Sequence, residues 1–175
     1  MKTKKRTDKN TIILFCVCVA FLAVIAVAIV WSLFTDIETV AEQYAVGMLQ
    51  NDSESIYAMY APQAVSYLLR ETDMTEKEIK TNLHTKMTRW AKGVLTDEIG
   101  ALSSAHADLV SKEDVPRETV EEMEANFDIH AQSAKKLTIS YHAEGEKGAK
   151  DGEMTVYVVK ISGVWYLYDL QMLLG

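Results

Sequence analysis

The longest apolar stretch of the chain lies near its start. Residues 11–34 read TIILFCVCVAFLAVIAVAIVWSLF, in which Thr11 and Ser32 are the only polar side chains. As a helix rising ~1.5 Å per residue, this stretch would reach about 36 Å, enough to cross a hydrocarbon core of about 30 Å. The pattern therefore predicts a transmembrane helix over 11–34, with membrane lipid as its partner.

Beyond this stretch, apolar residues recur every three to four positions, which is the spacing of an amphipathic helix. Prolines and capping residues divide the region into separate helices. The expected helices cover about 36–50, a short segment from Ser53 to the Ala61-Pro62 stop, a segment beginning at Pro62, about 76–97, and a segment beginning at Pro116 with Val120, Met123 and Phe127 on one face. The helix over 76–97 is expected to weaken at Gly93 and to close before Gly100.

Two of these helices begin with a capping-box pattern, a hydroxyl residue followed three positions later by Glu. Thr35 and Thr75 are the two hydroxyl residues, and we expect their side chains to cap helices. In the helix that begins at Pro62, the spacing predicts four buried side chains: Ala64, Val65, Leu68 and Leu69.

Towards the C-terminus the apolar period changes to two, which is typical of strands with one wet face. The expected elements are a strand over 137–143, a charged, glycine-bearing loop over 144–152, a strand over 154–161, a tight turn at Ser162-Gly163 and a return strand over 164–170. A further strand is expected over 101–111. Helices followed mainly by an antiparallel meander indicate an α+β fold.

The last hairpin has apolar residues on both faces. A turn at Ser162-Gly163 would place Val159 opposite Tyr166, and Tyr157 opposite Tyr168. The alternate positions are also apolar, so both faces need cover. The N-terminal helices can cover one face, and either the helix near 116–127 or a second copy of the chain, in a homodimer, can cover the other.

Charge is distributed very unevenly. Residues 1–10 carry five Lys or Arg and one Asp, a net charge of +4, and residues 11–34 carry none. Residues 35–175 carry the other 13 basic and 24 acidic residues, a net charge of −11. The positive-inside rule then predicts a basic cytoplasmic tail over 1–10 and an extracytoplasmic domain over 35–175, so that the C-terminal domain is extracellular. The negative domain argues against nucleic acid as a partner.

Both cysteines, Cys16 and Cys18, lie within the apolar stretch, so the outer domain must fold without disulfides. Ala26-Val27-Ala28 fits the small-x-small pattern of a signal-peptidase site. The apolar residues continue beyond Ala28, however, which favours a permanent anchor in the cell membrane over a cleaved signal peptide.

Two segments resemble the nuclear transport factor 2-like family. They are MLQNDSESIYAMYAP, with a polar break after the first helix, and the C-terminal MTVYVVKISGVWYLYDL. The resemblance covers about 36–170 and is greatest to the membrane-anchored members of Gram-positive bacterial envelopes. It implies a cone-like domain of helices packed on a curved antiparallel sheet. Because isomerases, hydratases, dimerisation modules and secretion-machine components share this fold, the resemblance does not decide the activity.

No catalytic constellation is evident in the sequence. The four histidines are far apart in sequence and show no metal-ligand spacing, and no phosphate loop or nucleophile elbow is present, so we expect neither a metal nor another cofactor, and no catalytic residues. The candidates for a ligand site or interface are the aromatic residues of the last hairpin: Tyr157, Tyr166, Tyr168 and Trp165.

The leading hypothesis is a single-pass membrane protein that presents a non-catalytic binding or assembly module outside the cell membrane, where tethering raises its effective concentration for a small ligand or an envelope protein. One alternative is a structural component of an envelope secretion or conjugation machine. Another is an enzyme that acts on a small hydrophobic molecule in the cone pocket, with Tyr157, Tyr166, Tyr168 and Asp169 as acid–base groups.

Overall fold

Helices precede strands along most of the described chain. The computed structural model describes residues 36–174, so the predicted basic tail and transmembrane helix over 1–34 lie outside the described residues. The elements are α2 (Ile37–Leu49), α3 (Ser53–Ala58), α4 (Pro62–Glu71), α5 (Glu76–Ala91), a π-helical turn η1 (Lys92–Thr96), α6 (Asp97–Ile99), β1 (Leu102–Asp114), α7 (Arg117–Phe127), β2 (Ser133–Gly145), β3 (Gly148–Ile161), β4 (Val164–Leu167) and a 3₁₀ turn η2 (Leu170–Met172). Among residues 36–174, no helix has both the length and the apolar character needed to cross a bilayer.

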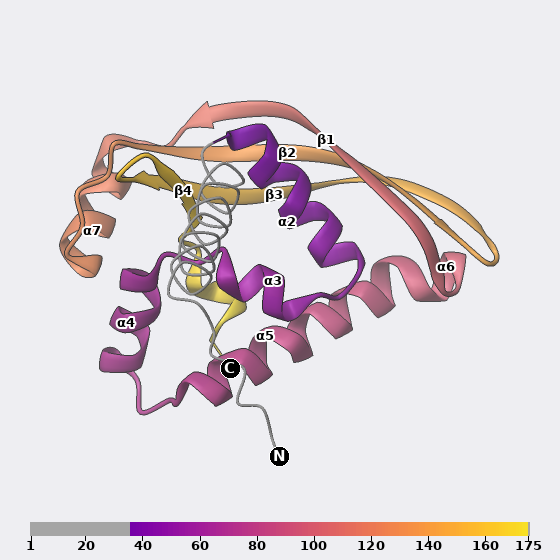
Figure 1. Cartoon of the computed structure of the whole chain (residues 1–175), viewed down its shortest axis with the longest axis horizontal. Coiled ribbons are helices and arrows are strands. Elements are labelled where there is room, and N and C mark those ends of the chain that lie inside the picture. Colours follow the sequence, from indigo (N-terminus) through magenta and orange to yellow (C-terminus); the bar gives the residue numbers. More distant parts are fainter. Residues whose placement is uncertain (1–35, 175) are drawn as a thin grey trace, which may run out of the picture. The chain divides into compact units, whose positions relative to one another are not determined.

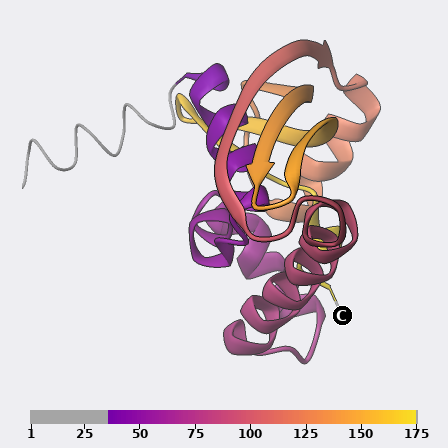
Figure 2. The same cartoon turned by 90° about the vertical axis from the view of Figure 1, so that its right-hand side faces the viewer.

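The strands form a four-stranded antiparallel sheet in the order β1-β2-β3-β4, so each strand pairs with its neighbour in the sequence. Helices α2, α3 and α5 lie together on one side of the sheet, and β1, β2 and β3 bend over α2 (Figures 1 and 2). Helix α7 lies near the end where β2 begins (Figure 1). The predicted α+β class is therefore confirmed.

The main hydrophobic core lies between these helices and one face of the sheet. The helices contribute fully buried side chains such as Val40, Ile79 and Leu83, each 0% exposed. The sheet contributes alternate residues of its strands: Leu137, Ile139, Tyr141, Ala143, Val156, Val158, Trp165 and Leu167. This is the period-two pattern that the sequence shows for β2 and for the last hairpin.

The opposite face of the sheet, called the second face below, carries a smaller apolar cluster under α7. Val159 of β3 is 0% exposed there and packs with Val120 and Met123 of α7. Phe127, Ile161, Tyr166 and Tyr168 pack around this cluster. Of the two covers that the sequence left open, the helix near 116–127 is present within the chain. A homodimer stays a prediction.

The register of the last hairpin is as expected from its turn. Val159 pairs with Tyr166, and Ile161 pairs with Val164. Ser162 and Gly163 both have positive φ, 50° and 86°, which is the backbone of a type I′ turn. The Gly163 N–H donates to the side-chain oxygen of Gln132 at 2.8 Å, which ties the turn to the loop that follows α7.

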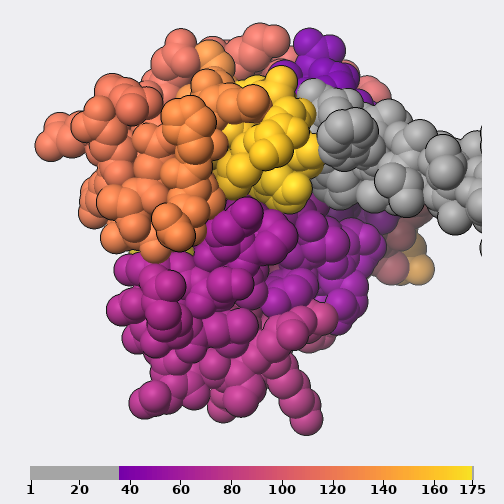
Figure 3. Space-filling model, turned by 60° about the vertical axis from the view of Figure 1, so that its left-hand side comes forward, coloured from indigo at the N-terminus to yellow at the C-terminus, as the bar shows by residue number. Residues whose placement is uncertain are grey.

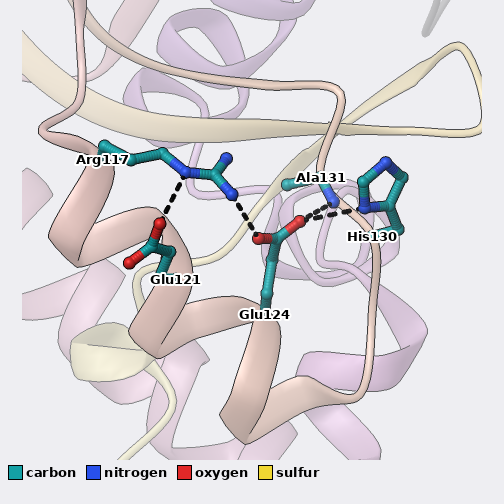
Figure 4. Close-up of polar contacts among 5 residues, drawn as sticks. All are labelled: Arg117, Glu121, Glu124, His130 and Ala131. Atoms are coloured by element: carbon teal, nitrogen blue, oxygen red, sulfur yellow. Dashed lines mark hydrogen bonds and ion pairs between the residues drawn. The ribbon is translucent and has the colours of Figure 1, made fainter.

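Helix α7 is fixed by a carboxylate near its C-terminus (Figure 4). Oε1 of Glu124, whose side chain is only 16% exposed, accepts the Ala131 N–H at 2.7 Å and lies 3.3 Å from Nδ1 of His130. Its other oxygen lies 3.5 Å from Arg117 Nη2, and Arg117 Nε donates to Glu121 at 2.9 Å. The network joins the start of α7, its last turn and the following loop.

The long helix follows the sequence closely. Thr75 Oγ1 accepts the Glu78 N–H at 3.3 Å, and the Glu78 carboxylate accepts the Thr75 N–H at 2.7 Å, which completes the predicted capping box. The helix widens into the π-helical turn that contains Gly93, and it ends at Gly100, where φ is 78°. At the first helix the N-cap is Asp36, one residue after the predicted Thr35, and its carboxylate accepts the Glu38 N–H at 3.3 Å.

The charged loop predicted over 144–152 is wrong, because β2 and β3 continue to a turn at Glu146 and Lys147. The hairpin tip bonds to a segment remote in sequence. Lys150 Nζ lies 2.5 Å from a Glu98 oxygen, and the Lys147 N–H donates to the Ile99 carbonyl at 2.9 Å. These partners stabilise a strand whose own composition is typical of a loop.

Two smaller expectations are also wrong. Leu69 is 36% exposed, because α4 turns Ala64 and Leu68 towards the core and the Tyr67 ring packs on Phe127 of α7, with centroids 5.3 Å apart. The last strand ends at Leu167 and not at residue 170. The Leu167 N–H donates to the carbonyl of Met59, in the α3–α4 connection, which bonds the edge of β4 away from β3 to that connection.

Replacement of Glu124 tests the attachment of α7. Glu124→Ala should lower the free energy of unfolding by about 2 kcal/mol, because it leaves the half-buried Ala131 N–H without an acceptor and removes the contact with Arg117. Glu122→Ala, on an exposed position of the same helix, should change it by less than about 0.5 kcal/mol. Urea unfolding of the two variants measures the difference, and equal losses would contradict this role of Glu124.

Candidate functional site

A cavity of about 430 Å³ lies where α7 begins and the last strand ends. We call it the tyrosine pocket, and its lining residues are Val115, Pro116, Thr119, Tyr157, Tyr168, Asp169 and Leu170. Figure 3 shows the surface over these segments, where α7 and its flanking residues lie beside the last residues of the chain. Its walls are mainly apolar and aromatic, with one carboxylate.

The two tyrosines reach the pocket through the alternation of the sheet. Tyr157 lies on the second face of β3, because Val156 and Val158 on either side of it point into the main core. Tyr168 follows β4, and its N–H donates to the Tyr157 carbonyl at 3.4 Å. The two rings pack edge to face, with centroids 6.1 Å apart and planes at 66°. The pairing of Tyr157 with Tyr168 therefore agrees with the predicted register.

Asp169 is held in place by a backbone bond. It is the N-cap of η2, and its Oδ1 accepts the Gln171 N–H at 3.0 Å. Among residues 36–174, no Lys or Arg side chain forms an ion pair with it. A carboxylate can accept about four hydrogen bonds, so most of its capacity is open to a ligand.

The phenols near Asp169 are held in their neutral form. Burial, the nearby Tyr157 and the charge of Asp169 together raise the pKa of Tyr168 to about 12. On the core side, burial and then the charge of Asp169 raise the pKa of Tyr44 to about 12, and burial is also the main cause that raises the pKa of Tyr60. At physiological pH these hydroxyls stay protonated, so they can donate hydrogen bonds but cannot act as bases.

The structure separates the four aromatic candidates. Tyr157 and Tyr168 meet in the tyrosine pocket, together with Asp169. Tyr166 packs against the α7 cluster, and Trp165 is only 7% exposed on the main-core face, with Lys160 Nζ 5.5 Å from its ring centroid. Neither of these two lines the pocket.

Sequence reasoning missed the opposite wall of the pocket. Val115, Pro116 and Thr119 come from the start of α7, about forty residues before Tyr157 in the chain. Pro116 did mark a helix start, but no local signal indicates where that helix packs. These three residues reach the pocket only through the tertiary packing of α7 on the sheet, which the local sequence does not indicate.

A cluster of polar residues lies on the part of the second face that is away from α7. His106 on β1, His142 on β2 and Asp151 on β3 are direct cross-strand partners. His142 Nδ1 lies 2.6 Å from Asp151 Oδ1, and His106 Nε2 lies 3.2 Å from Asp108 Oδ2. Within residues 36–174, no group of three or more His, Cys, Asp or Glu side chains is arranged to hold a metal ion.

A larger groove between α3 and α5 is lined by charged residues, several of which pair with one another. Lys80 Nζ lies 3.2 Å from Glu76 and 3.6 Å from Glu54, and 4.6 Å from the centroid of the Tyr57 ring. Ser53 Oγ lies 3.3 Å from His84 Nδ1. Because Lys80, Glu76 and Glu54 are already paired with one another, this groove is a weaker ligand site than the tyrosine pocket.

Titration of His142 tests the cross-strand cluster. The hydrogen bond to Asp151, followed by the charges of Asp151 and Glu144, raises the pKa of His142 above its ordinary 6.5. The contact with Asp151 is therefore most stabilising below pH 6.5, and this contribution is lost as pH rises through the raised pKa. In a proton NMR titration, Asp151→Asn should lower the His142 pKa, whereas Asp108→Asn, beside His106, should leave it unchanged. An unaltered His142 titration in Asp151→Asn would show that this pair does not form.

Comparison with known proteins assigns no family to the chain. No family model matches its sequence, and no curated protein matches it. The resemblance to the nuclear transport factor 2-like family is therefore carried only by the two segments quoted above.

Proposed function

We propose that the chain is a single-pass membrane protein whose residues 35–175 form a non-catalytic binding or assembly module outside the cell membrane. The uncharged stretch over 11–34 and the net +4 charge before it support this topology. The binding site in this proposal is the tyrosine pocket, and the ligand is a small molecule or a side chain of an envelope protein.

The observation that carries the binding role is the meeting of Tyr157, Tyr168 and Asp169 in one cavity. Aromatic and aliphatic walls with one fixed polar group are typical of ligand sites. The raised pKa of Tyr168 keeps its hydroxyl neutral, and this favours a role in holding a ligand over a role in removing a proton from it.

The cone-like, nuclear transport factor 2-like form of the domain is part of the proposal. It is supported by a sheet that bends over α2, with further helices on the same side (Figure 1). In this form the tyrosine pocket lies outside the main core, at the margin of the second face. A partner could then reach it without entering the helix–sheet interior.

Cysteine labelling in intact cells tests the topology. In a background with Cys16→Ser and Cys18→Ser, the chain has no other thiol. Glu146→Cys, at the exposed tip of the β2–β3 hairpin, should react with a membrane-impermeant maleimide in intact cells. Thr3→Cys, in the basic tail, should react only after permeabilisation, because a charged reagent does not cross the bilayer. Labelling of Thr3→Cys alone in intact cells would reverse the proposed orientation, and labelling of neither would place both ends inside.

A further inference from the structure

We infer that the tyrosine pocket recognises an organic cation, an ammonium group at the end of a short apolar stem. This rests on the proposed function, in which the pocket is the binding site, and it adds the chemical class of the ligand. The class follows from the charge of the pocket, its aromatic rings and its apolar walls.

The charge of the pocket is negative and unpaired within the described residues. Asp169 is the only formally charged residue among those that line it. Among residues 36–174, the Asp169 carboxylate accepts one hydrogen bond, from the Gln171 N–H, and forms no ion pair. A half-buried carboxylate gains most from a cation, and it repels carboxylate or phosphate groups.

The first turn of α7 does not reverse this preference. A helix N-terminus carries a partial charge of about +0.5, which by itself would favour an anion. Glu118 lies in that first turn and offsets the partial charge, and Asp169 adds a full negative charge to the pocket. Arg117 in the same turn carries a positive charge, but it is paired with Glu121 and Glu124 of α7, so the charge near the cavity remains negative.

Elsewhere in this domain, a lysine ammonium group is bound by a tyrosine ring and a carboxylate. Lys80 Nζ lies 4.6 Å from the centroid of the Tyr57 ring and 3.2 Å from the Glu76 carboxylate. A tyrosine ring and a carboxylate thus hold an ammonium group between α3 and α5. The tyrosine pocket combines the same two kinds of group, two Tyr rings and Asp169, without a Lys or Arg among its lining residues.

The remaining walls define the stem of the ligand. Val115, Pro116 and Leu170 are apolar, and Thr119 adds one hydroxyl, so an alkyl chain can pack along them while its cationic end faces Asp169. The net charge of −11 over residues 35–175 also attracts cations to the domain from a distance. A lysine side chain of a partner protein and a free alkylammonium share this chemistry.

Three small probes that share an n-butyl chain test the inference. The full chain in a nonionic detergent, with carbon-13 in its tyrosine rings, is titrated with n-butylammonium, n-butanol and pentanoate. The signals of Tyr157 and Tyr168 are assigned by Tyr157→Phe and Tyr168→Phe. We expect n-butylammonium to shift these signals with an affinity at least about tenfold higher than n-butanol, because charge and ring contacts add to packing. Pentanoate should not bind.

Matched aspartate variants identify the charge responsible. Asp169→Asn should reduce the affinity for n-butylammonium about tenfold or more, since Asn still caps η2 but carries no charge. Asp151→Asn removes the same charge from the far part of the second face and should leave the affinity unchanged. A loss of equal size in both variants would overturn the inference, because a diffuse field would then account for binding.

The probes also separate this inference from the proposed function. If n-butanol binds as tightly as n-butylammonium and Asp169→Asn has no effect, the pocket binds ligands but the cation inference is wrong. If no probe shifts Tyr157 or Tyr168, both are wrong. Two further cations distinguish the sources, and binding of either supports the inference: acetyl-Gly-Lys-Gly-amide stands for a lysine on a partner protein, and tetramethylammonium for a free quaternary amine.

Discussion

The fold depends on the burial of two adjacent valines that point in opposite directions. Val158 and Val159 on β3 are both 0% exposed, although neighbouring residues of a strand lie on opposite faces of the sheet. Each valine contributes about 1.5–3 kcal/mol only if its own face is covered. Both faces of β3 therefore have to be covered by other parts of the chain. Helices α2 and α5 lie over the face of Val158, and α7 lies over that of Val159.

The cover of the second face is incomplete, and the tyrosine pocket lies at its margin. Helix α7 has 11 residues and covers the apolar end of the second face, whereas the other end carries His142 and Asp151 and stays open to solvent. Strand β4 ends at Leu167, whose N–H and carbonyl bond to the α3–α4 connection on the edge of β4 away from β3. The Tyr168 N–H still bonds to the Tyr157 carbonyl of β3, and the chain then enters η2 beside the start of α7. The bonds of Leu167 to the α3–α4 connection and of Tyr168 to β3 together place Tyr168 and Asp169 at the margin of the second face.

Features set by neighbouring residues could be predicted from the sequence. The capping box at Thr75, the Ser162-Gly163 turn and the pairing of Tyr157 with Tyr168 each depend on residues close in the chain or on a strict period of two. The apolar character of both hairpin faces also predicted that each needs cover, and it named the helix near 116–127 as one candidate. Most of the α+β fold, and half of the tyrosine pocket, follow from such local rules.

The remaining features depend on partners far apart in sequence. The segment over 144–152 has the composition of a loop, but it forms strands whose Lys150 pairs with Glu98. Likewise, the edge of β4 away from β3 bonds to Met59, and the Thr119 side of the pocket depends on how α7 packs. Spacing and composition carry no information on these contacts, because each joins residues from different elements.

Local capping also orders the one carboxylate of the tyrosine pocket. Asp36, Asp52 and Asp169 all accept a backbone N–H at the start of a helical segment, so the chain uses the same device at each place. Asp36 and Asp52 each accept a second hydrogen bond, from the hydroxyls of Thr39 and Ser55 respectively. Asp169 has only the cap bond among the described residues. That bond already orders the carboxylate, so a ligand that binds it would not have to offset the entropy cost of ordering this side chain.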